Sequence, residues 1–214
     1  MTGRSRVKIK ILICSSLAMA LLSGCFEKND EQKIILNNVP DIVAKGDYHK
    51  GTDIIRKGAE QGYASDQYLL GLIYSRGIGM PQDYQLAATW FGKAAEQGHE
   101  LSQIKLGWMY SEGKGVAQDH QKAVYWFRKA AEQGNDVAQF VLGQKYERGE
   151  GVKQDSKLAY VWYSVSVANN SKDSNNEDLA KIRDAVAKKL TQEELHEAQK
   201  LASKYFKLYP TKQP

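Results

Sequence analysis

The sequence predicts an all-α fold, an α/α solenoid of helix–turn–helix repeats closed by a C-terminal helical cap. A glycine-rich phrase occurs three times, as SRGIGMPQD, SEGKGVAQD and ERGEGVKQD, with Gly77, Gly113 and Gly149 spaced by 36 residues. In the second half of each unit, apolar residues fall at helical spacing. A fixed period of this length is typical of repeat proteins, whose units bury their apolar faces by stacking.

A phosphate-binding loop is the alternative interpretation of the glycine-rich phrase. Such a loop needs a lysine followed by a hydroxyl residue, and it follows a buried strand. Lys114 stands between two glycines, and no β-rich run precedes it. The phrase is therefore predicted to be a tight turn, in which glycine supplies the positive φ.

The chain begins with the pattern of an export signal, residues 1–24. Four basic residues precede a mostly apolar stretch, 11–22, which is too short to span a bilayer. The phrase LSGC, which ends at Cys25, resembles the bacterial lipobox. This resemblance implies cleavage before Cys25 and diacylation of its sulfur, followed by a polar tether over residues 25–40. An ordinary secretory signal with a chance cysteine is the alternative.

Residues 41–63 are expected to form a degenerate half-repeat. Asp47 and Tyr48 match Asp83 and Tyr84 at the 36-residue offset, and the run KGAEQG occurs at the same offset. Three complete repeats are then predicted over residues 64–170.

Each complete repeat is predicted to read helix, glycine turn, helix. An aspartate precedes the second helix, where an N-cap is expected, and a glycine follows its end in two copies. These residues are Asp83, Asp119, Asp155, Gly98 and Gly134. The first helix keeps a glycine at Gly71, Gly107 and Gly143, although glycine costs a helix about 1 kcal/mol relative to alanine. We therefore expect the paired helix to approach closely there, and we place the repeated tryptophans, Trp90, Trp126 and Trp162, in the core.

The remaining segment, residues 171–214, is predicted to be a polar linker and a helical cap. Helical patterns run over about 179–190 and 192–206, and Thr191 with Glu194 fits a capping box.

The phrase LGWMYSEGKGVAQDHQKAVYWFRKAAEQG resembles the Sel-1-like repeat, a relative of the tetratricopeptide repeat. The resemblance covers roughly residues 47–170, and the ending KKLTQEELHEAQKLA resembles the C-terminal cap of such proteins. It implies a superhelix that mediates contacts between proteins, and it implies no particular reaction or partner.

Composition argues against several classes of function. The chain has 30 basic and 25 acidic residues, and the signal carries four of the basic ones and none of the acidic ones, which leaves the mature protein at about +1. We therefore expect no nucleic-acid partner.

The cysteines and histidines argue against a metal site or a catalytic site. Cys14 leaves with the signal and Cys25 carries lipid, so no thiol remains for a disulfide or a zinc cluster. None of the four histidines recurs with the period, and no hydrolase or metalloprotease motif occurs. We expect no enzyme activity, no cofactor and no metal.

A binding groove is predicted along the first helices, if their LG pair aligns with that of tetratricopeptide repeats. The groove-facing positions are Ser65, Tyr68, Leu72, Ser75, Arg76, Leu101, Ile104, Trp108, Ser111, Glu112, Val137, Phe140, Gln144, Glu147 and Arg148. Trp108 is the strongest candidate for a binding anchor, because its equivalents are Leu72 and Gln144 and aromatic anchors are frequent at interfaces. The alternative is that these rings pack inside the protein.

Two functions fit these expectations. The first is a lipid-anchored, non-catalytic adaptor of the periplasm that binds another exported protein or peptide. The second is an immunity lipoprotein that inhibits a type VI secretion toxin such as a phospholipase, because Sel-1-like lipoproteins of similar layout block such toxins. Phe26 follows the lipidated cysteine, and the absence of aspartate there implies the outer membrane by resemblance to enterobacterial lipoproteins.

Overall fold

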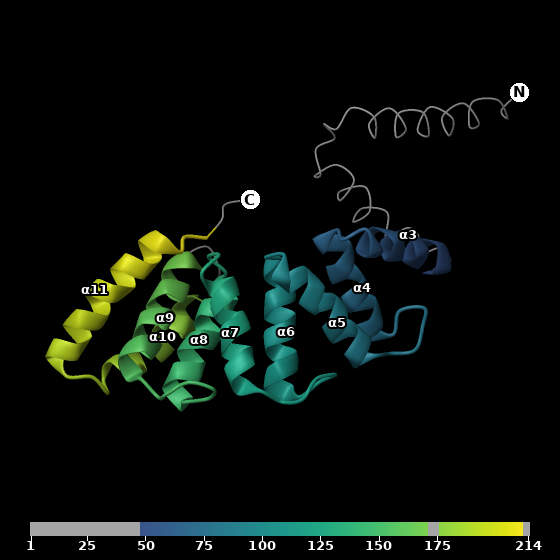
Figure 1. Ribbon diagram of the computed structural model, residues 1–214. Coiled ribbons are helices and arrows are strands. Elements are labelled where there is room, and N and C mark those ends of the chain that lie inside the picture. Colours follow the sequence, from purple (N-terminus) through teal and green to yellow (C-terminus); the bar gives the residue numbers. More distant parts are fainter. Residues whose placement is uncertain (1–47, 171–175, 212–214) are drawn as a thin grey trace, which may run out of the picture. The chain divides into compact units, whose positions relative to one another are not determined.

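The computed structural model describes residues 48–170 and 176–211, and every regular element in these ranges is a helix (Figure 1). In chain order the helices are α3 (Tyr48–Glu60), α4 (Ala64–Arg76), α5 (Tyr84–Glu96), α6 (Glu100–Glu112), α7 (His120–Ala131), α8 (Asp136–Arg148), α9 (Ser156–Asn169), α10 (Asn176–Ala187) and α11 (Gln192–Leu208). Each helix from α3 to α9 packs on the next one, and both α10 and α11 pack on α9. The prediction of an all-α repeat fold is confirmed.

The predicted signal (1–24), the lipidation site at Cys25 and the tether (25–40) lie outside the described residues. The first residues of the predicted half-repeat and the start of the polar linker also lie outside them. None of the helices in the described ranges combines the length and the apolar content that crossing a bilayer requires.

The second helix of every complete repeat begins at the predicted aspartate. Asp83 accepts hydrogen bonds from the backbone N–H groups of Gln85 and Leu86, both at 2.9 Å. Asp119 and Asp155 each accept one bond of 2.9 Å from the N–H three residues later. These carboxylates satisfy donors that would otherwise have no partner at the helix start.

Glycines end the first helices and hold the two helices of a repeat together. Gly113 caps α6 with φ +70°, a left-handed backbone conformation that residues other than glycine rarely adopt. Gly107, in the middle of α6, lies so close to α7 that a Cβ there would stand 2.9 Å from the Phe127 ring. The equivalent Gly71 and Gly143 face Phe91 and Tyr163 in the same way. The expected close approach of the helices is confirmed.

The tryptophans differ from the expectation that all three are core residues. Only Trp162 is buried, at 4% exposure, whereas Trp90 and Trp126 are half-buried. The rings that fill the hairpins belong to the next residue along each helix, Phe91 and Phe127. Trp162 is buried because the cap covers it: its ring lies 5.2 Å from that of Tyr205 and 6.0 Å from that of Tyr209.

A ladder of buried amides joins each repeat to the one before it. Gln103 donates to the carbonyl of Ala95 in the preceding repeat at 3.1 Å and accepts from Gln133 at the end of its own repeat at 2.8 Å. Equivalent pairs of bonds are formed by Gln67, which bonds Ala59 and Gln97, and by Gln139, which bonds Ala131 and Asn169. We call these residues the glutamine ladder. Because it satisfies buried polar groups at every junction, it fixes how successive repeats are placed.

The cap ends the solenoid as the sequence indicated. Thr191 and Glu194 form the predicted capping box at the start of α11. Beyond α11 the chain reaches the last rung of the ladder, where Asn169 donates to the carbonyl of Tyr209 at 3.0 Å and accepts from the Thr211 N–H at 3.3 Å.

Two glycine-to-alanine substitutions test the close approach within a hairpin. Gly107→Ala places a methyl group against Phe127, and we expect overpacking to lower the free energy of unfolding by about 1 to 3 kcal/mol. Gly92→Ala is the matched control, because Gly92 also lies mid-helix but a Cβ there would meet no atom within 4 Å. It should raise the free energy of unfolding by about 1 kcal/mol through helix propensity alone. Urea unfolding followed by circular dichroism measures both, and a stabilising Gly107→Ala would contradict the packing account.

Candidate functional site

The predicted groove residues lie on α4, α6 and α8, the first helices of the three repeats. All ten principal positions keep some exposed surface: Tyr68, Leu72, Arg76, Ile104, Trp108, Glu112, Phe140, Gln144, Glu147 and Arg148. Their role in binding stays a prediction. Ser111 differs from the groove-facing position expected for it, because it is buried and its Oγ lies 2.9 Å from the Nζ of Lys145.

Apolar side chains at these positions remain exposed on the surface of each first helix. Trp108 is 38% exposed, and Leu101 and Val137, at equivalent positions one repeat apart, are 48% and 52% exposed. Tyr68, Leu72, Ile104 and Phe140 are half-buried. We call these seven residues the apolar strip. Single exposed apolar side chains are normal on protein surfaces, but here they recur on successive first helices, which is the arrangement that the predicted groove requires.

The rings of the strip rest on the core rings of their own repeats. Trp108 meets Phe127 edge to face at 5.2 Å between ring centroids, and Phe140 lies 5.3 Å from Tyr163. One side of the Trp108 ring is therefore held by the core while the rest is exposed. These contacts agree in part with the alternative that the rings pack inside the protein, whereas a binding role for them stays a prediction. Truncation of Trp108 to alanine would remove internal packing as well as exposed surface.

Charged residues at the ends of the first helices differ in their availability. Arg76, Glu112 and Arg148 are exposed, and Glu112 pairs with Lys114 at 3.4 Å. The Glu147 carboxylate instead accepts from the Tyr163 hydroxyl at 2.9 Å and from Lys189 at 2.7 Å. The bond from Lys189 is the main cause that lowers the pKa of Glu147. Glu147 thus already binds the turn between α10 and α11, which the repeat pattern alone did not indicate.

His99 connects the strip to the start of α6. Its Nδ1 accepts from the Ser102 N–H at 3.3 Å as the N-cap, and its ring lies 4.8 Å from the Tyr68 ring. Burial lowers the pKa of His99 below its usual value of 6.5, because a charged imidazole is poorly solvated there.

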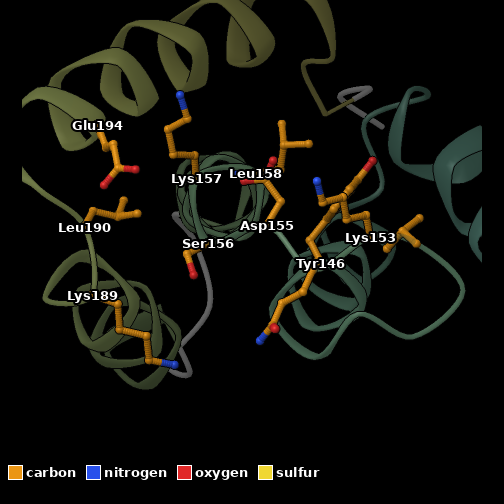
Figure 2. Close-up of a pocket in the computed structure, with 11 residues that line it drawn as sticks. Tyr146, Lys153, Asp155, Ser156, Lys157, Leu158, Lys189, Leu190 and Glu194 are labelled. Atoms are coloured by element: carbon orange, nitrogen blue, oxygen red, sulfur yellow. Dashed lines mark hydrogen bonds between the residues drawn. The ribbon is translucent and has the colours of Figure 1, made fainter.

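A hollow of about 620 Å³ lies where the start of α9 faces the turn between α10 and α11 (Figure 2). Three of its polar residues are already engaged: Asp155 caps α9, Lys157 pairs with Glu197 at 2.8 Å, and Lys189 pairs with Glu147. Ser156, at the first position of α9, has no neighbouring histidine among the residues that line this hollow. Ser156 therefore lacks in this lining the histidine base that commonly activates a serine.

Known proteins share this architecture. A family model described as Sel1 repeat matches residues 64–99, 101–135 and 136–171. The crystal structure of a Sel1 repeat protein from Oxalobacter formigenes is similar at 36% sequence identity and a TM-score of 0.52, over 58% of this chain and 92% of that one. A protective antigen of uropathogenic Escherichia coli with an SLR fold is similar at 30% identity and a TM-score of 0.56, over 78% of this chain. The match covers 44% of the antigen, so this chain spans less than half of that protein's length. No curated protein matches.

The lowered pKa of His99 predicts a loss of stability in mild acid. The folded protein binds a proton at His99 less readily than the unfolded chain does, so protonation favours the unfolded chain once the pH falls below 6.5. We expect His99→Asn to reduce the fall in melting temperature between about pH 7.5 and about pH 5.5. Asparagine can keep the cap, as Asn135 does for α8 with a bond of 2.8 Å to the Ala138 N–H. An unchanged pH dependence in this variant would show that His99 is not the group responsible.

Proposed function

The chain belongs to the Sel1 repeat family, and we propose that it is a lipid-anchored envelope protein whose helical repeats bind another exported protein or peptide. Proteins of this family generally mediate contacts between proteins and typically are not catalysts. The observation that carries the proposal is the apolar strip, in which Trp108 lies on the first helix of the second repeat.

The strip fits a partner that offers an apolar face. Large rings that already pack on one side against core residues lose little conformational entropy on binding, which favours them as anchors. Arg76, Glu112 and Arg148 stand at one end of the three helices and carry charges of alternating sign. Such a rim selects a partner by charge complementarity and adds less to the affinity than the rings do.

The location outside the cytoplasm rests on the N-terminal sequence. A basic stretch, an apolar stretch of twelve residues and the phrase LSGC at residues 22–25 favour export and lipid attachment at Cys25. The anchored protein would face the periplasm, with the outer membrane as the expected membrane because Phe26 follows the cysteine.

Trp108→Gln tests the strip without a large loss of packing, because Gln144 occupies the equivalent place in the third repeat. We expect roughly tenfold or greater loss of the partner recovered by cross-linking in envelope extracts, with little change in the melting temperature. Tyr125→Gln is the matched control, because Tyr125 is a 53% exposed aromatic residue on α7, outside the strip.

Equal recovery with the wild type and Trp108→Gln would remove the strip from the proposal. The identity of the captured protein separates the two functions: a toxin such as a phospholipase, with growth inhibition of cells that lack this chain, would establish immunity. Capture of a resident envelope protein would establish the adaptor role.

Cys25→Ser tests the anchor separately. We expect the wild type to incorporate labelled palmitate and to fractionate with membranes, and the variant to lose both properties while keeping its helical circular dichroism. Unlabelled wild-type protein in the cytosolic fraction would refute the envelope location and leave the strip untouched.

A further inference from the structure

The junction between the second and third repeats contains an arginine that bonds a buried tyrosine. Arg128 of α7 donates from Nη2 to the hydroxyl of Tyr146 in α8 at 2.6 Å. Tyr146 is 9% exposed, so the guanidinium lies over a largely covered phenol. Lys129 follows Arg128 on the same helix, Glu132 is the C-cap of that helix, and both are exposed.

One repeat earlier the tyrosine is present and the arginine is not. Tyr110 is the equivalent of Tyr146, and Gly92 stands at the position of Arg128. Within residues 48–170 and 176–211, no hydrogen bond to the Tyr110 hydroxyl is found. Two neighbouring positions of α5 are also smaller than their equivalents on α7, with Ala88 and Thr89 in place of Val124 and Tyr125.

These smaller residues leave a hollow of about 420 Å³ between α5 and α7, over α6. A Cβ added at Gly92 would meet no atom within 4 Å, so the space begins at the helix surface. The residues that line it and bear on a ligand are Gly92, Glu96, Leu106, Tyr110, Val116 and Trp126. None of them belongs to the apolar strip, so this is a second surface.

We propose that this hollow is an arginine-accepting site, which takes the guanidinium of an arginine presented by a partner protein. The phenol of Tyr110 would accept a hydrogen bond, as Tyr146 does from Arg128. Trp126 also lines the hollow, and a guanidinium stacks on an indole face better than other side-chain cations do. Glu96 supplies a carboxylate at the rim, where it can pair with the guanidinium.

The charges around the hollow are mixed: the Glu96 side chain lines it, and the Nζ of Lys122 lies 5.4 Å from the centroid of the Tyr110 ring. Lys93 lines the hollow, but its Nζ lies 4.0 Å from the centroid of the Trp90 ring. The same pair of residues, a lysine and a glutamate three positions later, follows Arg128 as Lys129 and Glu132 at the end of α7. In the third repeat a planar group does stack on the equivalent tryptophan, because Tyr209 lies on Trp162 at an angle of 18° between the ring planes.

Titration of the full chain with an arginine peptide tests the site. The probe is acetyl-Gly-Arg-Gly-amide, and the readout is the indole N–H signals of the four tryptophans in ¹⁵N-tryptophan-labelled protein. We expect a saturable shift of the Trp126 signal with a dissociation constant on the order of 1 mM, and no shift of the Trp162 signal. The citrulline peptide, a neutral isostere, should bind roughly tenfold more weakly because it lacks the charge.

Variants at residue 92 give the matched comparison. Gly92→Arg should fill the hollow from within and reduce binding of the peptide roughly tenfold or more, while raising the melting temperature. Gly92→Ala adds only a methyl group and should keep binding, and Tyr110→Phe should weaken it. Because the apolar strip lies outside this hollow, Trp108→Gln should leave binding of the peptide unchanged. A negative result in the peptide titration would therefore not count against the strip. Absence of a saturable Trp126 shift, equal binding of the citrulline peptide, or undiminished binding by Gly92→Arg would overturn the proposal.

Discussion

Each repeat depends on one close contact, between a glycine in its first helix and an aromatic ring in its second. At Gly107 the absent side chain lets the Phe127 ring lie against the backbone of α6. This contact also fixes the orientation of the surface. Successive residues of an α-helix point about 100° apart, so a glycine turned toward the ring places the next residue, Trp108, at the side of this contact. There the Trp108 ring meets the edge of the Phe127 ring and stays 38% exposed. The same contact that closes the hairpin therefore presents the strip.

The glutamine ladder extends this local geometry along the chain. Gln103 spans from one repeat to a carbonyl of the previous one, and it is itself held by Gln133. The Ala95 carbonyl and the Gln133 amide must therefore keep their places, because the buried Gln103 amide would be left without hydrogen bonds if either moved away. Residues after α11 extend the glutamine ladder, because the Tyr209 carbonyl accepts a hydrogen bond from the Asn169 side chain and the Thr211 N–H donates one to it. The cap thus closes the ladder with backbone groups, where an additional repeat would have used its own side chains.

Much of this fold could be predicted from the sequence because its determinants are local. The aspartate caps, the left-handed glycines and the box at Thr191 act within a few residues, and the 36-residue period repeats them. What could not be predicted depends on contacts between distant elements. Trp126 and Trp162 share a position in the repeat, but the cap covers only the latter, and periodicity cannot show which end of a stack is covered. Glu147 was likewise expected at the groove, and its bond to Lys189 required the position of the cap to be known.

Differences between repeats divide into those that the fold compensates and those that it leaves open. Lys145 stands where the previous repeat has Met109, and the buried ammonium is matched by Glu150 at 2.7 Å, which itself replaces Lys114. The second change compensates the first, because a buried charge requires a partner of opposite charge. Gly92 differs from Arg128 without such a match: no neighbour grows to fill the space, and the tyrosine across from it keeps its hydroxyl. A compensated difference keeps the packing of the repeat intact, whereas the uncompensated one at Gly92 leaves the open surface on which the proposed arginine site rests.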